Sequence, residues 1–191
     1  MPESRIIVDA VQGISPGGEE RPAPPKIAVK LHGGETVHLD MSSPQAKTWA
    51  GILGTMQRAK QAVYLETDPK TNIVTELLIP RAVKVATLKS GNKRRDVEVE
   101  LVVSQMRHYL RRSNPNFNGL LSIFENALKT ETPVLVTDSR DRNEIIDVRL
   151  IPEIVSVPGY LSAPLTQLKP PTASSSAPKK RRPRYGKGGA Q

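Results

Sequence analysis

Three histidines and the lack of any cysteine limit the metal and nucleophile chemistry open to this chain. His32 and His38 flank a predicted hairpin turn, where Glu35 or Asp40 would complete a His/His/carboxylate set for zinc or iron. Histidine pairs at such loose spacing are common by chance, so we favour ordinary hairpin residues and assign no metal and no cofactor. Without cysteine there is no disulfide scaffold, no thiol nucleophile and no thiolate metal site.

Sequence motifs of catalysis are also missing. The chain contains no P-loop, no dinucleotide-binding glycine pattern, no nucleophile elbow and no metalloprotease motif. Ser104 and Ser113 lie near His108 in sequence, but a Ser–His–Asp triad is defined by its geometry and not by such proximity. The acidic segment 138–147 contains Arg140 and Arg142 and no glycine, which favours a solvated hairpin tip over a calcium loop. We therefore predict that the protein is not an enzyme.

The best binding candidate within the body of the chain is the segment 107–117. Its arginines, Arg107, Arg111 and Arg112, are interspersed with a histidine and a tyrosine and precede a predicted helix start, whose free amides attract anions. Guanidinium groups match phosphate oxygens, and an aromatic ring can stack on an exposed base. The pattern predicts a nucleic-acid-binding patch. The alternative is that the aromatic and leucine side chains belong to the core and the arginines are merely solvated.

The positive charge is concentrated at the C-terminus. Of the net charge of +9, the segment 169–191 carries seven basic side chains and no acid, so the other residues have a net charge of only +2. Proline, serine and glycine dominate this segment, which predicts disorder. Cations on a flexible chain bind phosphates by releasing counterions, which makes these residues candidates for nucleic-acid contact: Lys179, Lys180, Arg181, Arg182 and Arg184. The alternative is a tail that only aids solubility.

Two segments of the chain, 51–85 and 119–157, resemble each other. Each begins with helix-period apolar residues and continues into a short β-rich run, a Thr-Asp turn, an apolar strand and an Ile-Pro pair, with gaps of about two residues needed to align them. Upstream, Ser-Ser-Pro at 42–44 and Ser-Asn-Pro at 113–115 predict helix starts with a serine cap and a proline in the first turn. Strand-like segments precede both, with a Gly-Gly hairpin turn at 33–34.

These elements predict an α+β fold made of two diverged copies of a strand–helix–antiparallel-strand-pair unit with pseudo-twofold symmetry, followed by a disordered basic tail. The predicted organisation is a flexible N-terminal segment over 1–25, a first repeat over 26–88, a basic connector over 89–95 and a second repeat over 96–157. A Pro/Ser-rich linker and the basic tail occupy 158–191. The alternative is chance similarity between two ordinary helix–hairpin units.

The sequence thus predicts a non-catalytic protein that associates with nucleic acid through its tail and through the arginines that precede the second helix. The competing hypothesis is a protein–protein interaction or self-assembly module. An enzyme with a cleft between the halves has no motif to support it. No apolar run is long enough for a membrane span, and the N-terminus lacks the plan of a signal peptide, so we expect no membrane association and a cytoplasmic location.

Overall fold

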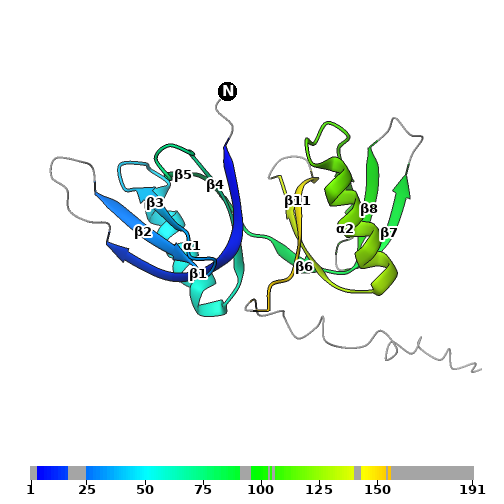
Figure 1. Ribbon diagram of the computed structural model, residues 1–191, viewed down its shortest axis with the longest axis horizontal. Coiled ribbons are helices and arrows are strands. Elements are labelled where there is room, and N and C mark those ends of the chain that lie inside the picture. Colours follow the sequence, from blue (N-terminus) through cyan, green and yellow to red (C-terminus); the bar gives the residue numbers. More distant parts are fainter. Residues whose placement is uncertain are drawn as a thin grey trace, which may run out of the picture.

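The computed structural model describes residues 4–16, 25–90, 96–102, 104, 106–139, 143–153 and 155. Within them the protein is mixed α+β, with its strands in two sheets, and each sheet is accompanied by one helix (Figure 1). No helix among these residues is long and apolar enough to cross a membrane. The tail residues proposed as nucleic-acid ligands, 179–184, lie outside the described part of the chain.

The first sheet has the strand order β3-β2-β1-β4-β5. Its outer strands β3 and β5 meet through a parallel bridge between His38 and Ile73, so the sheet curls into a five-stranded barrel. Trp49 and Leu53 of the helix α1 pack into its core. The elements are β1 (Arg5–Pro16), β2 (Lys26–Leu31), β3 (Thr36–Asp40), α1 (Ala46–Ala59), β4 (Ala62–Thr67) and β5 (Val74–Leu78).

The second sheet has the order β6-β10-β11-β9-β8-β7. Only Lys84 separates β6 from β7, so these two strands form one bent segment that closes a second barrel. Leu120 and Phe124 of the helix α2 are buried in its core. The elements are β6 (Arg81–Val83), β7 (Val85–Ser90), β8 (Val97–Leu101), β9 (His108–Leu110), α2 (Phe117–Thr130), β10 (Val134–Asp138) and β11 (Glu144–Leu150).

Strand pairing follows the same register in both barrels. Tyr64 pairs with Leu78, and Leu135 pairs with Arg149, 71 residues further along the chain in each strand. A register irregularity follows Glu66 in β4 and Thr137 in β10, at the corresponding place. The β1–β2 and β7–β8 pairs each contain a bulge, after Val11 and after Val85.

Backbone conformations also recur at this spacing. Lys60 and Glu131 end the two helices with φ of 51° and 54°, and Asn72 and Asn143 have φ of 53° and 49° before β5 and β11. The carbonyls of these two asparagines accept the amides of His38 and Tyr109, at 2.9 and 3.1 Å. The left-handed region costs a non-glycine residue energy, so each pair marks a turn that the surrounding fold imposes.

Two sequence-based boundaries are wrong. The segment 1–25 is not uniformly flexible, because residues 5–16 form β1, which pairs with both β2 and β4 and buries Ala10 and Val11. The first unit does not extend to residue 88, because β6 and β7 belong to the second sheet. Of the predicted connector, Lys89 and Ser90 lie in β7, and residues 91–95 are outside the described part.

The helix starts also differ from the expectation. The N-cap residues are Gln45 and Asn116, neither of which caps its helix through its side chain. Pro44 and Pro115 therefore precede the caps instead of occupying the first helical turn. The hydroxyl of Ser42 is engaged elsewhere, donating to Asp40 Oδ1 at 2.7 Å, and this contact lowers the pKa of Asp40.

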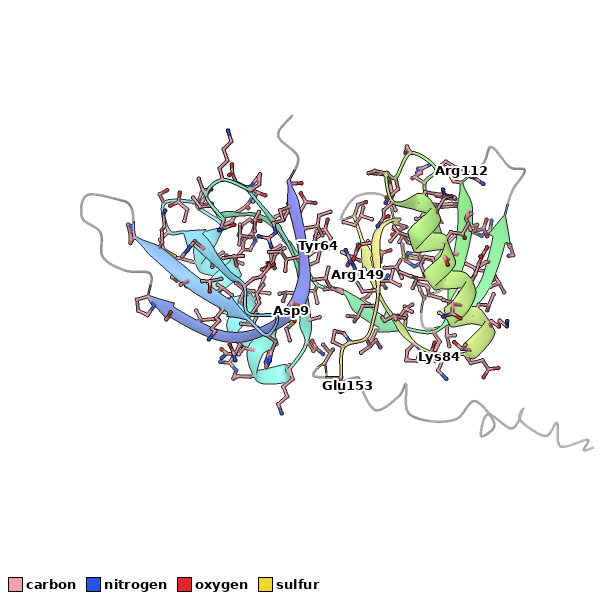
Figure 2. All side chains as sticks on the ribbon, viewed as in Figure 1. Asp9, Tyr64, Lys84, Arg112, Arg149 and Glu153 are labelled. Atoms are coloured by element: carbon pink, nitrogen blue, oxygen red, sulfur yellow. The ribbon has the colours of Figure 1, made fainter. Side chains whose placement is uncertain are left out.

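Asp9 organises the hairpin turn between β2 and β3. Its carboxylate accepts the amide of Gly33 at 2.6 Å and that of Ala10 at 2.7 Å (Figure 2 labels Asp9). A β-carbon at Gly33 would lie 3.1 Å from this carboxylate, and Gly34 has φ of +89°. The glycine pair thus provides both the close approach and the left-handed turn.

Replacing Asp9 with alanine is expected to lower the free energy of unfolding by about 1–3 kcal/mol, because the Gly33 amide loses its acceptor. Urea unfolding of Asp9→Ala would measure the loss, and Asp9→Asn, which keeps one acceptor oxygen, should lose less. An alanine variant as stable as the wild type would show that the turn does not depend on this carboxylate.

Candidate functional site

The three predicted arginines of the second barrel are engaged with carboxylates or with a ring. Arg107, just before β9, has its Nε 3.5 Å from Glu98 Oε1, although its side chain is largely exposed. Arg111 at the end of β9 donates to Asp96 Oδ2 at 2.7 Å and lies 3.6 Å from Glu144. The guanidinium of Arg112 lies 4.4 Å from the centroid of the Phe117 ring.

Asp96 holds two of these arginines in place. Its second oxygen accepts the backbone amide of Arg112 at 2.9 Å. The Arg112 amide and the Arg111 guanidinium lower the pKa of Asp96, and Asp96 in turn raises the pKa of Arg111. Arg112 also lines a hollow of about 290 Å³ that residues 114–119 form at the start of α2. The arrangement is a set of ion pairs around a helix N-terminus.

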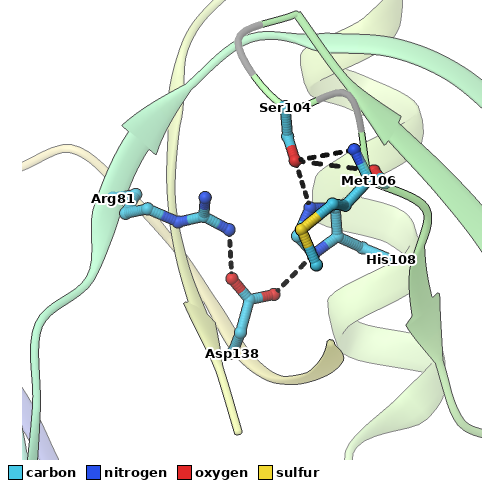
Figure 3. A network of polar contacts seen from close by, with 5 residues as sticks. All are labelled: Arg81, Ser104, Met106, His108 and Asp138. Atoms are coloured by element: carbon cyan, nitrogen blue, oxygen red, sulfur yellow. Dashed lines mark hydrogen bonds and ion pairs between the residues drawn. The ribbon is translucent and has the colours of Figure 1, made fainter. Parts of the chain in front are cut away.

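A second polar cluster lies at one end of the second barrel (Figure 3). Ser104 Oγ is 2.9 Å from His108 Nε2, and His108 Nδ1 is 3.0 Å from Asp138 Oδ1. The other oxygen of Asp138 accepts a hydrogen bond from Arg81. The side chain of His108 is 3% exposed and that of Asp138 is 15% exposed. The sequence placed Ser104 near His108, but nothing in it indicated that Asp138, 30 residues away, completes the chain of contacts.

The order Ser–His–Asp in this cluster is the order of a catalytic triad. Two contacts favour a structural role instead. Asp138 shares its charge with Arg81, and Ser104 Oγ already accepts the amide of Met106 at 3.3 Å. The cluster ties the loop between β8 and β9 to the first residue of β6 and the last residue of β10.

The first barrel has apolar side chains or threonine where the second has this cluster. Arg81 pairs with Val136 in β10, and Ile7 pairs with Leu65 in β4. The corresponding positions of His108 and Asp138 are Val37 and Thr67, both buried. The second barrel thus replaces a packed end with a hydrogen-bonded one.

The acidic residues considered as a cation loop are ion-paired where they are described. Glu144 faces Arg111, and both oxygens of Asp147 accept hydrogen bonds from Arg149, at 3.1 and 2.9 Å. Asp141 lies outside the described residues. Within the described ranges no group of three or more His, Cys, Asp or Glu side chains is placed to hold a metal ion.

The two barrels contact each other through a small apolar cluster. It joins strands of the first barrel to β6, β10 and the C-terminal residues of the described chain: Ala10, Ala62, Leu135 and Val155, with Ala82 and Ile151 packed against them. Beside it, Tyr64 of β4 and Arg149 of β11 lie between the two barrels (Figure 2). Tyr64 is 1% exposed and donates to Glu66 Oε1 at 2.8 Å.

Burial and this hydrogen bond raise the pKa of Tyr64 above its usual value, with a further contribution from the charge of Asp147. The folded state therefore favours the neutral phenol. The corresponding stability is complete below pH ~10 and is lost as the pH rises above it, by up to about 1.4 kcal/mol per pH unit.

Urea unfolding between pH ~8 and ~11 should show this loss in the wild type and a flatter profile in Tyr64→Phe. The same variant should lose about 1 kcal/mol at neutral pH, the worth of one hydrogen bond. Parallel alkaline profiles for the two proteins would show that Tyr64 is not the titrating group. No family model, curated protein or solved structure matches the chain, so the fold and the contacts above are the observations from which its function is inferred.

Proposed function

We propose that the protein is a non-catalytic binder of single-stranded nucleic acid. The observation that supports this most is architectural. Each half forms a five-stranded barrel of mixed strands with one helix between its third and fourth strands. Small five-stranded Greek-key barrels of this kind commonly bind oligonucleotides on the face of their second and third strands. This is an argument from fold analogy, and the residues that follow give it chemical content.

We also propose that the two barrels are diverged copies of one unit. Their shared strand register, bulges and left-handed turns support a duplication, as does the spacing of 71 residues that runs without a gap from Val37 in β3 to Leu78 in β5. The alignment places Thr67 opposite Asp138, one residue away from the Thr-Asp pairing that the sequence suggested. Two copies would offer two binding faces in one chain.

The tail supplies the general attraction to phosphate. Lys179, Lys180, Arg181, Arg182 and Arg184 give an excess of positive charge in a segment that contains no acid. Neutralising phosphates releases condensed counterions, so the affinity contributed by such residues falls steeply with salt. The predicted arginines of the second barrel contribute less, because carboxylates already surround two of them.

A salt titration of the full chain tests this function. Labelled single-stranded DNA and RNA of about 20 nucleotides, long enough to span the site of one or two barrels, would be titrated in fluorescence anisotropy. We expect binding at about 50 mM salt and a steep loss of affinity by about 200 mM. No binding of either oligonucleotide at the lower salt would contradict the proposal.

A protein partner is the second candidate, and one surface favours it. Leu150 is 64% exposed at the end of β11, where it borders a hollow with Ile123, Ser122 and Lys129 of α2. An apolar surface of this kind can hold a protein partner or a second copy of the chain. The tail would then serve solubility only. Light scattering on the full chain and on Leu150→Glu would reveal self-association that depends on this surface.

A further inference from the structure

The outward faces of the two barrels differ in how their charges are satisfied. The comparison concerns the second and third strands of each barrel and the strand beside them. In the second barrel, Glu98 and Glu100 occupy the middle strand β8. Lys89 lies against both carboxylates, 3.7 Å from Glu98, and Arg107 also approaches Glu98. Thr87 donates to Glu100 at 2.7 Å. Positive charge on this face is therefore already neutralised, and the carboxylates would repel phosphates.

The same positions in the first barrel carry no carboxylate. The strand register places Ala28 where the second barrel has Glu98, and Lys30 where it has Glu100. Lys26 and Lys30 have no carboxylate within 4 Å among the described residues. We call this surface the β2–β3 face; its outward side chains are Lys26, Ala28, Lys30, Thr36, His38 and Asp40.

The acids near this face are occupied by local contacts. Asp40 accepts the amide of Ser42 at 2.9 Å as well as its hydroxyl. Asp68 accepts the amides of Lys70 and Thr71, at 2.8 and 3.0 Å. These contacts hold the carboxylates against their own backbone. They also position the turn 68–72, which the bond from the His38 amide to the Asn72 carbonyl fixes beside β3.

The shape of the β2–β3 face suits an extended chain. The residues opposite Lys30 and Ala28 on β1 are Gly13 and Ser15, so the middle of the face carries only small side chains. An added β-carbon at Gly13 would meet nothing within 4 Å. The imidazole of His38 stands across from Ala28, and its Nδ1 has no hydrogen-bond partner within the described part of the chain. A phosphodiester backbone can approach such a surface closely, with the lysines as point charges.

We propose that single-stranded nucleic acid lies across the β2–β3 face of the first barrel, with Lys26 and Lys30 on its phosphates and His38 beside a base. This assignment rests on the proposed function. It moves the binding surface from the arginines of the second barrel to the first barrel. The second barrel then serves as the rigid neighbour that holds the tail near the bound strand.

The test compares three double variants of the full chain that remove the same charge. K26Q/K30Q changes the β2–β3 face, R107Q/R111Q changes the arginine patch, and K47Q/K129Q removes two exposed lysines from the helices as a control. Labelled oligothymidylate of about 20 nucleotides is titrated at several salt concentrations. We expect K26Q/K30Q to weaken binding about tenfold and to reduce the salt slope by about 1.4, and the other two to weaken it less than about twofold.

A second measurement needs no variant. Acetylation of the wild-type chain, with and without oligothymidylate, should show Lys26 and Lys30 protected by the ligand and Lys47 equally modified in both. The assignment is wrong if K26Q/K30Q binds as the helix control does, if R107Q/R111Q loses more, or if Lys26 and Lys30 are modified equally with and without ligand. In those cases the wild type still binds, and the proposed function stands. If the wild type does not bind at all, both the function and this assignment fail.

Discussion

Removal of residues 169–191 is expected to weaken binding of a single-stranded oligonucleotide by about 100-fold or more at about 50 mM salt. The segment holds seven of the chain's 28 basic side chains and no acid. Each phosphate contact on a single strand contributes about 0.7 to the slope of log K against log salt, so the slope should become shallower by up to about 5. Fluorescence anisotropy on the full chain and on a chain that ends at Leu168 would measure both quantities.

A tail of the same composition in scrambled order is the matched control. Counterion release depends on the number of cations and not on their order, so this variant should bind as the wild type does. A truncated chain that keeps both the affinity and the salt slope would place all of the binding in the barrels. A scrambled tail that loses affinity would indicate sequence-specific contacts instead of general attraction.

Local patterns in the sequence were sufficient to predict the elements near the middle of each barrel. The apolar alternation of residues 27–31 and 97–101 gave β2 and β8, and the glycine pair at 33–34 gave the hairpin that leads into β3. Both helices begin within three residues of their predicted proline signals. These features depend on neighbours in the chain, which is why a single sequence shows them.

The first strand could not be recognised in the same way. Residues 5–16 lie in a region whose prolines and glycines suggested flexibility, and the partner of their first half, β4, begins 46 residues later at Ala62. The pairing that makes this segment a strand is therefore long-range. The same reasoning applies to β6, which the sequence attached to the preceding strand although it pairs with β10. Tertiary pairing overrode the local signal in both places.

The candidate site shows the same division. The sequence reveals that Arg107 and Arg111 are cationic, but not that Glu98, Asp96 and Glu144 arrive from other strands to pair with them. Conversely, Lys26 and Lys30 were not singled out, because two separated lysines in a strand form no motif. What distinguishes them is that no carboxylate lies beside them, and this is a property of the folded barrel.

The end of the second barrel provides the sharpest test of the duplication. Replacing His108 with valine, the residue at the corresponding position of the first barrel, is expected to lower the free energy of unfolding by about 2–3 kcal/mol. The reason is that Asp138 is mostly buried and would lose the imidazole that donates to it, while keeping only Arg81. Urea unfolding with a constant m-value would give the loss directly.

The triple variant Arg81→Ile, His108→Val and Asp138→Thr should regain most of that stability. It copies Ile7, Val37 and Thr67 from the first barrel, which pack at the matching end. Replacing every member of a buried polar network with well-packed side chains is often neutral or stabilising, whereas removing one member leaves an uncompensated group. If the two barrels are diverged copies, the second retains space for the side chains of the first, and the triple variant will be more stable than His108→Val alone. A triple variant less stable than the single one would mean that the second barrel has repacked around its polar end and no longer shares the geometry of the first.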